Sequence, residues 1–183
     1  MGAENQLGRD ESFMGEALVM AREAFGRGEF PVGCIIVRDG EIIARGNRLG
    51  TAAPGTRFSE IDHAEIRALK SMESDGLGIP QGSVDDTTLY CTMEPCLMCF
   101  SAIILSGIRR VVYAYEDAMG GGTGCDLSAL PPLYRECKIR VVDGVCRQKS
   151  LDLFYDFFNK EENLYWKNSY LERYTRAQVE EQG

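Results

Sequence analysis

The sequence contains a single histidine, His63, and a single Cys-x-x-Cys pair, formed by Cys96 and Cys99. Residues three apart on a helix share one face, so both thiol groups of the pair can point toward one metal ion. The start of a helix after Pro95 would also favour their thiolate form. One imidazole and two thiolates give zinc three ligands and leave a fourth position for water, as in catalytic zinc sites. The spacing therefore predicts a catalytic zinc site.

Glu65 follows His63 by two residues, at the predicted start of a helix. From there its carboxylate can lie beside the metal without binding it. It can take a proton from water and return a proton to a leaving group. Zinc lowers the pKa of its bound water to about 7. These residues predict hydrolytic chemistry with Glu65 as the acid–base group.

Each half of this pattern also has other interpretations. A lone histidine is most often a core or surface residue, and a Cys-x-x-Cys pair can be redox-active or half of a structural zinc site. Cys91, five residues before Cys96 in a predicted strand, could complete a structural site as a fourth ligand. The two half-motifs together favour the catalytic interpretation, because a redox pair gives no reason for the His-x-Glu sequence.

The elements that must position these residues follow from the hydrophobic pattern. Helices are expected over 11–26, 62–72, 96–106 and from 150 onward, and strands over 32–38, 41–45, 87–92, 110–114 and 138–142. Asp39 and Gly40 predict a hairpin with a type I′ turn, Asp62 is the expected cap of the second helix, and Gly107 ends the third. Strands that alternate with helices are typical of the α/β class.

The glycine-rich stretch 120–124 is expected to be a flexible loop at the rim of the site. It lacks the Gly-Lys-Ser/Thr ending of a phosphate-binding loop and the spacing of a dinucleotide fingerprint.

Length and composition limit the class of protein. With 183 residues we expect a single domain over 1–183, with a core at about 11–160 and a helical tail at 161–183. The seven cysteines are an odd number, the N-terminus is polar, and no apolar run could span a membrane. We therefore expect reduced thiols and a cytoplasmic location. The formal charge of −8 disfavours a broad nucleic-acid surface.

The sequence resembles the cytidine-deaminase superfamily of zinc nucleobase deaminases, and most closely its TadA-like branch of tRNA adenosine and guanine deaminases. A His-x-Glu sequence followed by Pro-Cys-x-x-Cys is the signature of such enzymes. The matching stretches are Glu29–Gly33, His63–Ile66, Leu89–Cys99 and Ile108–Tyr113, within a similarity that covers most of 11–160.

The resemblance implies a fold, a cofactor and an activity. It implies a three-layer α/β/α sandwich around a mixed five-stranded sheet, a homodimer, and a hydrolase that removes an exocyclic amino group as ammonia. It also implies one Zn²⁺ per chain, held by His63, Cys96 and Cys99. It further implies that Asn47 helps to hold the base and that Glu65 transfers the proton. We assign Glu94, in the same motif, to substrate binding as well.

Departures from the family pattern bear on the substrate. Residues 59–62 are Ser-Glu-Ile-Asp, where tRNA-editing and guanine-deaminating members usually carry Asp-Pro-Thr-Ala. Residues 151–183 hold four basic and seven acidic residues. A tail that contacts RNA phosphates is expected to be basic. We therefore expect a free base or nucleoside as substrate, with the wobble adenosine of tRNA as the alternative. An inactive, zinc-stabilised partner subunit is a remote alternative, which the retained Glu65 opposes.

Two groups of side chains near the predicted site have open roles. Arginines flank the predicted base-binding loop and could form a basic rim, although we expect them to be solvated: Arg45, Arg48 and Arg57. The tail is rich in aromatic residues, which either pack onto the protein or form a lid that stacks on the base: Tyr155, Tyr165, Trp166, Tyr170 and Tyr174.

Overall fold

The computed structural model describes residues 3–52, 58–80 and 86–181. Its helices are α1 (Ala3–Gly26), α2 (Ala64–Ser74), α3 (Leu97–Leu105), α4 (Pro132–Arg135), α5 (Arg147–Asn159) and α6 (Tyr170–Glu180), with a 3-10 turn at Leu127–Ala129. Its strands are β1 (Gly33–Arg38), β2 (Glu41–Asn47), β3 (Thr87–Met93), β4 (Arg110–Tyr115) and β5 (Arg140–Val142).

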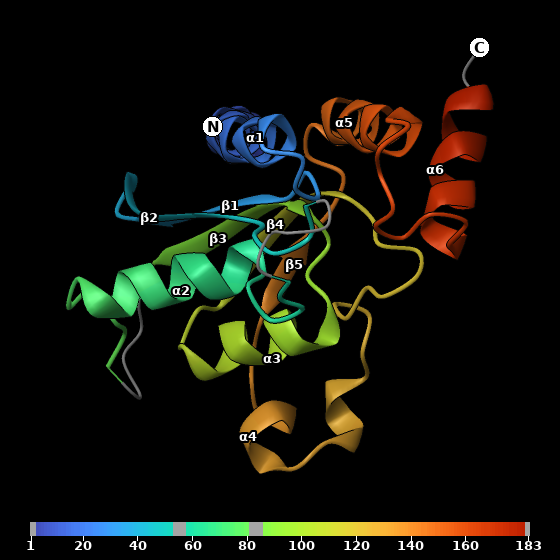
Figure 1. The fold of residues 1–183 in the computed structure, drawn as a ribbon. Helices are drawn as coiled ribbons and strands as arrows, with labels where there is room; N and C mark the ends of the chain where they lie inside the picture. Colours follow the sequence, from blue (N-terminus) through green and yellow to red (C-terminus); the bar gives the residue numbers. More distant parts are fainter. Residues whose placement is uncertain (1–2, 53–57, 81–85, 182–183) are drawn as a thin grey trace.

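The five strands form one mixed sheet in the order β2-β1-β3-β4-β5. Strand β1 pairs antiparallel with β2 and β3, whereas β3, β4 and β5 run parallel. Helices α1 and α5 cover one face of the sheet, and α2 and α3 cover the other (Figure 1). The expected three-layer α/β/α sandwich around a mixed five-stranded sheet is confirmed.

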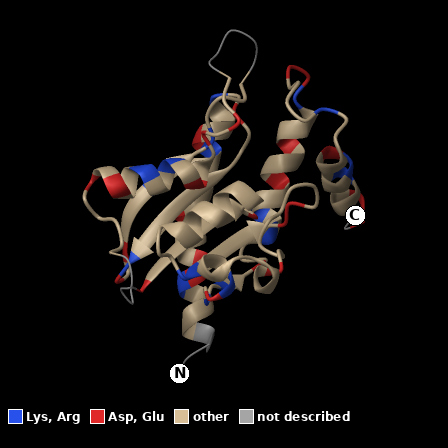
Figure 2. Ribbon diagram, turned by 90° about the horizontal axis from the view of Figure 1, so that it is seen from below, with Lys and Arg blue, Asp and Glu red and all other residues tan. Residues whose placement is uncertain are grey.

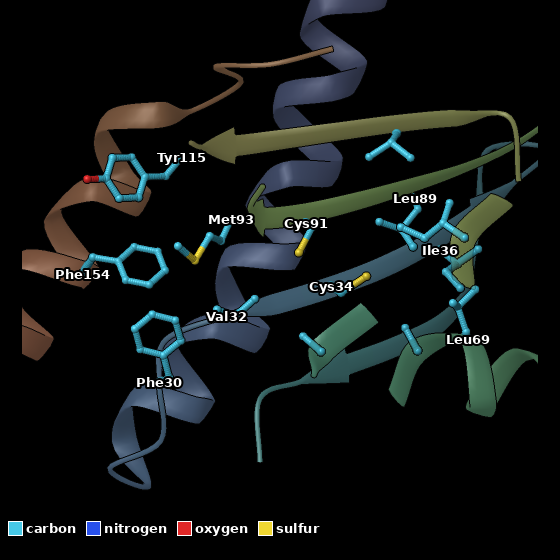
Figure 3. Close-up of a cluster of buried hydrophobic side chains, with 14 of the residues drawn as sticks. Phe30, Val32, Cys34, Ile36, Leu69, Leu89, Cys91, Met93, Tyr115 and Phe154 are labelled. Atoms are coloured by element: carbon cyan, nitrogen blue, oxygen red, sulfur yellow. The ribbon is translucent and has the colours of Figure 1, made fainter. Parts of the chain in front are cut away.

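The core lies on both faces of the central strands, since every residue of β3 is buried. Along β1, Cys34 and Ile36 pack on the face of α2, and Ile35 and Val37 pack on the face of α1. This alternation is the period-2 pattern of a strand. Figure 3 shows the aromatic end of the α2-side core, where Phe30 from the segment before β1, Tyr115 of β4 and Phe154 of α5 meet.

Most predicted elements are present with shifted ends. The turn between β1 and β2 has positive φ at Asp39 and Gly40, 53° and 81°, as a type I′ turn requires. Helix α1 begins eight residues before the predicted start at 11. The helix expected from 150 onward is two helices with an irregular stretch between them, in which Trp166 and Asn168 have left-handed backbone conformations that interrupt a helix.

The predicted cap of α2 was wrong. His63, not Asp62, is the N-cap residue of α2, and its side chain makes no capping hydrogen bond. Its ring nitrogen instead faces the thiol groups of Cys96 and Cys99. The side chain at the N-cap position of α2 therefore contacts the two cysteines and does not cap the helix.

Helix α2 packs unusually close to β2 because Gly46 has no side chain. A Cβ atom on Gly46 would lie 2.1 Å from the carbonyl oxygen of Ala64 and 2.7 Å from the amide nitrogen of Ala68. Ala64 lies between His63 and Glu65, so this close approach sets where the two predicted functional side chains stand.

Helix α1 is tied to the sheet by a buried ion pair. The Arg110 guanidinium on β4 lies 2.6 Å from the carboxylate of Asp10 on α1, whose side chain is 4% exposed. The Tyr90 hydroxyl on β3 also donates a hydrogen bond to Asp10, at 2.8 Å. Within the described residues, no helix is long and apolar enough to cross a membrane.

Candidate active site

The structure brings the three predicted zinc ligands together. His63 Nδ1 lies 3.7 Å from Cys96 Sγ and 3.4 Å from Cys99 Sγ. In a tetrahedron with Zn–S of about 2.3 Å and Zn–N of about 2.0 Å, neighbouring N and S ligands are about 3.5 Å apart. In the described part of the chain, this group has the geometry and the donor atoms for a metal ion. The three side chains are thus positioned to bind zinc.

The ligands stand at the N-termini of two helices. His63 is the N-cap of α2, Cys96 is the N-cap of α3, and Cys99 is in the first turn of α3. The N-terminus of a helix carries a partial positive charge, which favours thiolates. The starts of these two helices therefore place the two cysteine sulfur atoms against an imidazole.

The cysteine pair carries negative charge. A hydrogen bond from the Cys99 thiol lowers the pKa of Cys96 to about 4, against the opposing effect of burial. The same hydrogen bond, together with burial, raises the pKa of Cys99. Burial tends to lower the pKa of His63, but its hydrogen bond to Cys96 and the Glu65 charge outweigh burial and raise it. The Cys96 thiolate attracts a divalent cation.

Glu65 is in the first turn of α2, where it is 3% exposed. Burial raises the pKa of its carboxyl group, although the charge of His63 opposes this. A carboxylate with a raised pKa accepts a proton more readily near neutral pH, which suits a group that must also return one.

A cavity of about 410 Å³ opens beside these side chains. His63, Glu65 and Cys96 form part of its wall. Its other lining residues come from several elements: Phe30, Val32, Arg48, Glu60, Ala64, Met93, Glu94, Asp117, Met119, Gly120, Tyr165, Trp166 and Leu171. A nucleobase or nucleoside fits within such a volume.

Glu94 lines the cavity, but its carboxylate also holds a loop. It accepts hydrogen bonds from the backbone of Asp117 at 3.2 Å and of Thr123 at 3.2 Å, and from the Thr123 hydroxyl. This loop contains the glycine-rich stretch, and Gly120 reaches the cavity, as expected of a rim loop. A Cβ atom on Gly122 would lie 2.4 Å from the amide nitrogen of Leu97, so the loop needs glycine to pass α3. A substrate contact by Glu94 stays a prediction.

Asn47 stands at the end of β2 and is not among the residues that line the cavity. Its side-chain oxygen accepts a hydrogen bond from Arg67 at 2.9 Å, and its amide donates one to Glu23 at 3.3 Å. Its contact with a base stays a prediction as well.

Cys91 does not join the metal group. It lies in β3 directly opposite Cys34 of β1, and both are fully buried. Figure 3 shows the two sulfur atoms side by side in the core. The structural zinc site with Cys91 as fourth ligand is therefore not supported.

Arg48 lies in the wall of the cavity, contrary to the prediction from sequence. The expectation of a solvated arginine was wrong, because Arg48 is 2% exposed and lines the cavity. Its partners, Glu60 and Tyr165, lie 12 and 117 residues away, so no local pattern indicates its burial. Arg45 is exposed and pairs with Glu16, and Arg57 lies outside the described residues.

The tail contributes to the wall of the cavity. Of its aromatic residues, Tyr165 and Trp166 line the cavity, and the buried Leu171 joins them. Tyr174 instead packs against Tyr115 and donates a hydrogen bond to Glu116. Part of the tail thus lines the cavity and part packs onto the core, while a lid that stacks on the base stays a prediction.

Residues 7–115 match the family model of the cytidine and deoxycytidylate deaminase zinc-binding region. The chain belongs to this deaminase family. A tRNA-specific adenosine deaminase of Bacillus subtilis is 34% identical over 83% of this chain and 90% of its own length. A tRNA-specific adenosine deaminase of Agrobacterium fabrum is 36% identical over 81% of this chain and 93% of its own. The family resemblance and the zinc cofactor are confirmed.

Solved structures agree with the fold. A tRNA deaminase that edits adenosine to inosine at the wobble position has a TM-score of 0.60 and 34% identity, over 78% of this chain and 98% of its own. A protein crystallised with 8-azaguanine has a TM-score of 0.64 and 26% identity, over 81% of this chain and 84% of its own.

Proposed function

We propose that this chain is a zinc-dependent hydrolase that removes the exocyclic amino group of a nucleobase as ammonia. The observation that carries the proposal is the position of Glu65. Its buried carboxyl group lies in the cavity wall next to His63 and Cys96, two of the three metal-binding side chains. A proton-transfer group and metal-binding side chains therefore line the same cavity, whose volume is large enough for a base.

The chain's own residues account for the proton transfers. Zinc, when bound, makes a water molecule acidic enough to lose a proton near pH 7. Glu65 takes that proton, and the water oxygen forms a bond to the ring carbon that carries the amino group. Glu65 then delivers the proton to the departing nitrogen, so that the C–N bond breaks and ammonia leaves. The apolar wall residues Phe30, Val32 and Met93 limit the access of other water.

Adenosine in tRNA is the first candidate substrate. The relatives aligned over most of this chain are named tRNA-specific adenosine deaminases, and a similar solved structure is a tRNA deaminase of the wobble position. These comparisons favour that alternative over the free base or nucleoside expected from the sequence.

A free base or nucleoside is the second candidate, because the tail closes part of the cavity. Tyr165 and Trp166 stand in its wall. Along the ribbon of Figure 2, acidic and basic residues are interspersed over the described chain. RNA binding normally requires a basic surface.

Ammonia release from a substrate panel tests the function and separates the candidates. The panel contains adenine, guanine, cytosine, their nucleosides and a tRNA anticodon stem-loop, each measured across salt concentration. A tRNA substrate should show a log–log salt slope of about −0.7 per phosphate neutralised, whereas a free base should show almost none. Release from the stem-loop alone supports the first candidate, and release from free bases or nucleosides supports the second. No release from any member by zinc-loaded protein would contradict the proposed function.

A further inference from the structure

Three cavity residues from distant parts of the chain form one hydrogen-bonded group. The Arg48 guanidinium lies 3.2 Å from the Glu60 carboxylate and donates to the Tyr165 hydroxyl at 3.3 Å. The Tyr165 hydroxyl in turn donates to the same Glu60 oxygen at 3.0 Å. The three side chains thus close a triangle that joins the end of β2, the approach to α2 and the C-terminal segment.

Arg48 is held firmly in this group. Its side chain is 2% exposed, and a buried charge is costly unless it is paired and hydrogen-bonded. It also donates to the backbone oxygen of Leu49 at 3.1 Å, and its guanidinium lies 5.9 Å from the centre of the Tyr165 ring. Moving Tyr165 away would therefore remove one partner of a buried cation.

Trp166 follows Tyr165 in the chain, and both residues line the cavity. The centres of the Tyr165 and Trp166 rings are 5.5 Å apart, and the Phe30 ring packs edge-on against Tyr165 with its centre 5.3 Å away. Trp166 has φ of 55°, a left-handed conformation that costs a non-glycine residue about 1 kcal/mol or more. Such a conformation persists where surrounding contacts impose it. Trp166 lines the cavity and is also 43% exposed, so this residue contacts both the cavity and solvent.

We propose that Trp166 is the residue on which the substrate base stacks, and that the triangle of Arg48, Glu60 and Tyr165 positions it. The ligand would be a flat, uncharged aromatic ring, because an indole face binds such rings by stacking. The proposal rests on the proposed function and holds for either substrate candidate, since a free base and a flipped-out nucleotide present the same ring. Trp166 would then be a binding residue and Arg48 a positioning residue.

Trp166 is the only tryptophan of the chain, so its fluorescence can report its position without reference to activity. In zinc-loaded protein, Tyr165→Phe removes the hydroxyl of the triangle and keeps the ring. We expect this variant to make Trp166 more accessible to acrylamide quenching. The matched control is Tyr170→Phe, the same change at an exposed residue that does not line the cavity. Equal quenching constants in Tyr165→Phe and the wild type would overturn the positioning part of the proposal.

Kinetics on the best substrate of the panel test the stacking part. Trp166→Ala should raise KM by about 5- to 150-fold, the equivalent of one base–aromatic stack of 1–3 kcal/mol, with a smaller change in kcat. Trp166→Phe should restore most of the loss, because phenylalanine keeps an aromatic face. A KM for Trp166→Ala within twofold of the wild type would overturn stacking. If the wild type released no ammonia at all, the proposed function would fail, while binding of 8-azaguanine, read as a change in Trp166 fluorescence, would still decide whether a base stacks there.

Discussion

At the scale of single residues, Glu65 is the group on which the proposed reaction depends. Glu65→Gln should keep the fold and the metal but lower kcat by about 10²–10⁴-fold, because an amide can neither accept nor return the proton. Turnover and zinc content should be measured on the same samples. Glu73→Gln makes the same change at an exposed residue of the same helix and should leave kcat unchanged. Near-normal turnover in zinc-loaded Glu65→Gln would rule out the proton path through this residue.

The metal ligands and Glu65 could be identified from sequence because they lie in two short motifs, and the spacing within each motif determines how its side chains lie relative to one another. His63 and Glu65 are two residues apart, and Cys96 and Cys99 are three apart. Arg48 could not be identified as a cavity residue from sequence, because its partners Glu60 and Tyr165 become its neighbours only when the chain folds.

At the scale of elements, the contact of α2 with β2 at Gly46 sets the position of the metal site. Gly46→Ala would place a methyl group 2.1 Å from the Ala64 carbonyl oxygen, so α2 must move. We expect a loss of about 1–3 kcal/mol in unfolding free energy, typical of overpacking, together with weaker zinc binding. Urea unfolding and a zinc titration measure the two effects.

A glycine in open space supplies the control for this substitution. Gly15 lies within α1, and a Cβ atom there would meet nothing within 4 Å. Gly15→Ala should therefore stabilise the protein by about 0.5–1 kcal/mol. Equal effects of the two substitutions would mean that close packing at Gly46 does not limit the position of α2.

The link between α1 and β4 gives a stability that depends on pH. Burial alone would raise the pKa of Asp10, but the hydrogen bonds from Arg110 and Tyr90 and the charge of Arg110 together outweigh burial and lower it. A lowered folded-state pKa means that the stabilisation is present above the unfolded value of about 3.9 and is lost as pH falls through the folded value. Asp10→Asn should cost about 3–5 kcal/mol at pH 7, because it leaves a mostly buried arginine without its carboxylate.

The measurement is urea unfolding of Asp10→Asn and the wild type at several pH values. Their difference should shrink as the pH falls below about 4. Glu16→Gln removes an exposed partner of Arg45 and should change stability by less than about 1 kcal/mol. A difference between Asp10→Asn and the wild type that stays constant down to pH 2 would show that the pair does not titrate as described.

The fold was largely predictable from sequence because local signals determine its elements. The Asp39–Gly40 turn and the alternation along β1 follow from patterns within a few residues. The break between α5 and α6 was missed because the aromatic pattern continues through it. That stretch is held by contacts such as the one between Lys160 Nζ and the backbone oxygen of Phe25, 135 residues away.

At the scale of the whole molecule, a homodimer stays a prediction, as do the cytoplasmic location and the single domain over 1–183. The outward side of α3 supports a dimer, because three apolar side chains there are exposed: Leu97 by 59%, Met98 by 38% and Leu105 by 59%. Exposed apolar patches often mark interfaces. Light scattering should find a dimer for the wild type and a monomer for Leu105→Asp. Leu7→Asp, at a 53% exposed residue of α1, should remain dimeric. A monomeric wild type would contradict the prediction.

The metal ligands come from two helices whose starts are separated in the chain, with His63 and Cys96 33 residues apart. A zinc ion held by both is therefore a cross-link that the denatured chain lacks, and its binding free energy adds to the folding free energy. At free zinc 1,000 times above its Kd, this linkage amounts to about 4 kcal/mol. Chains of this size change Tm by about 2–4 °C per kcal/mol, so complete chelation should lower Tm by roughly 8–16 °C. An unchanged Tm after verified zinc removal would show that the ion contributes to chemistry alone.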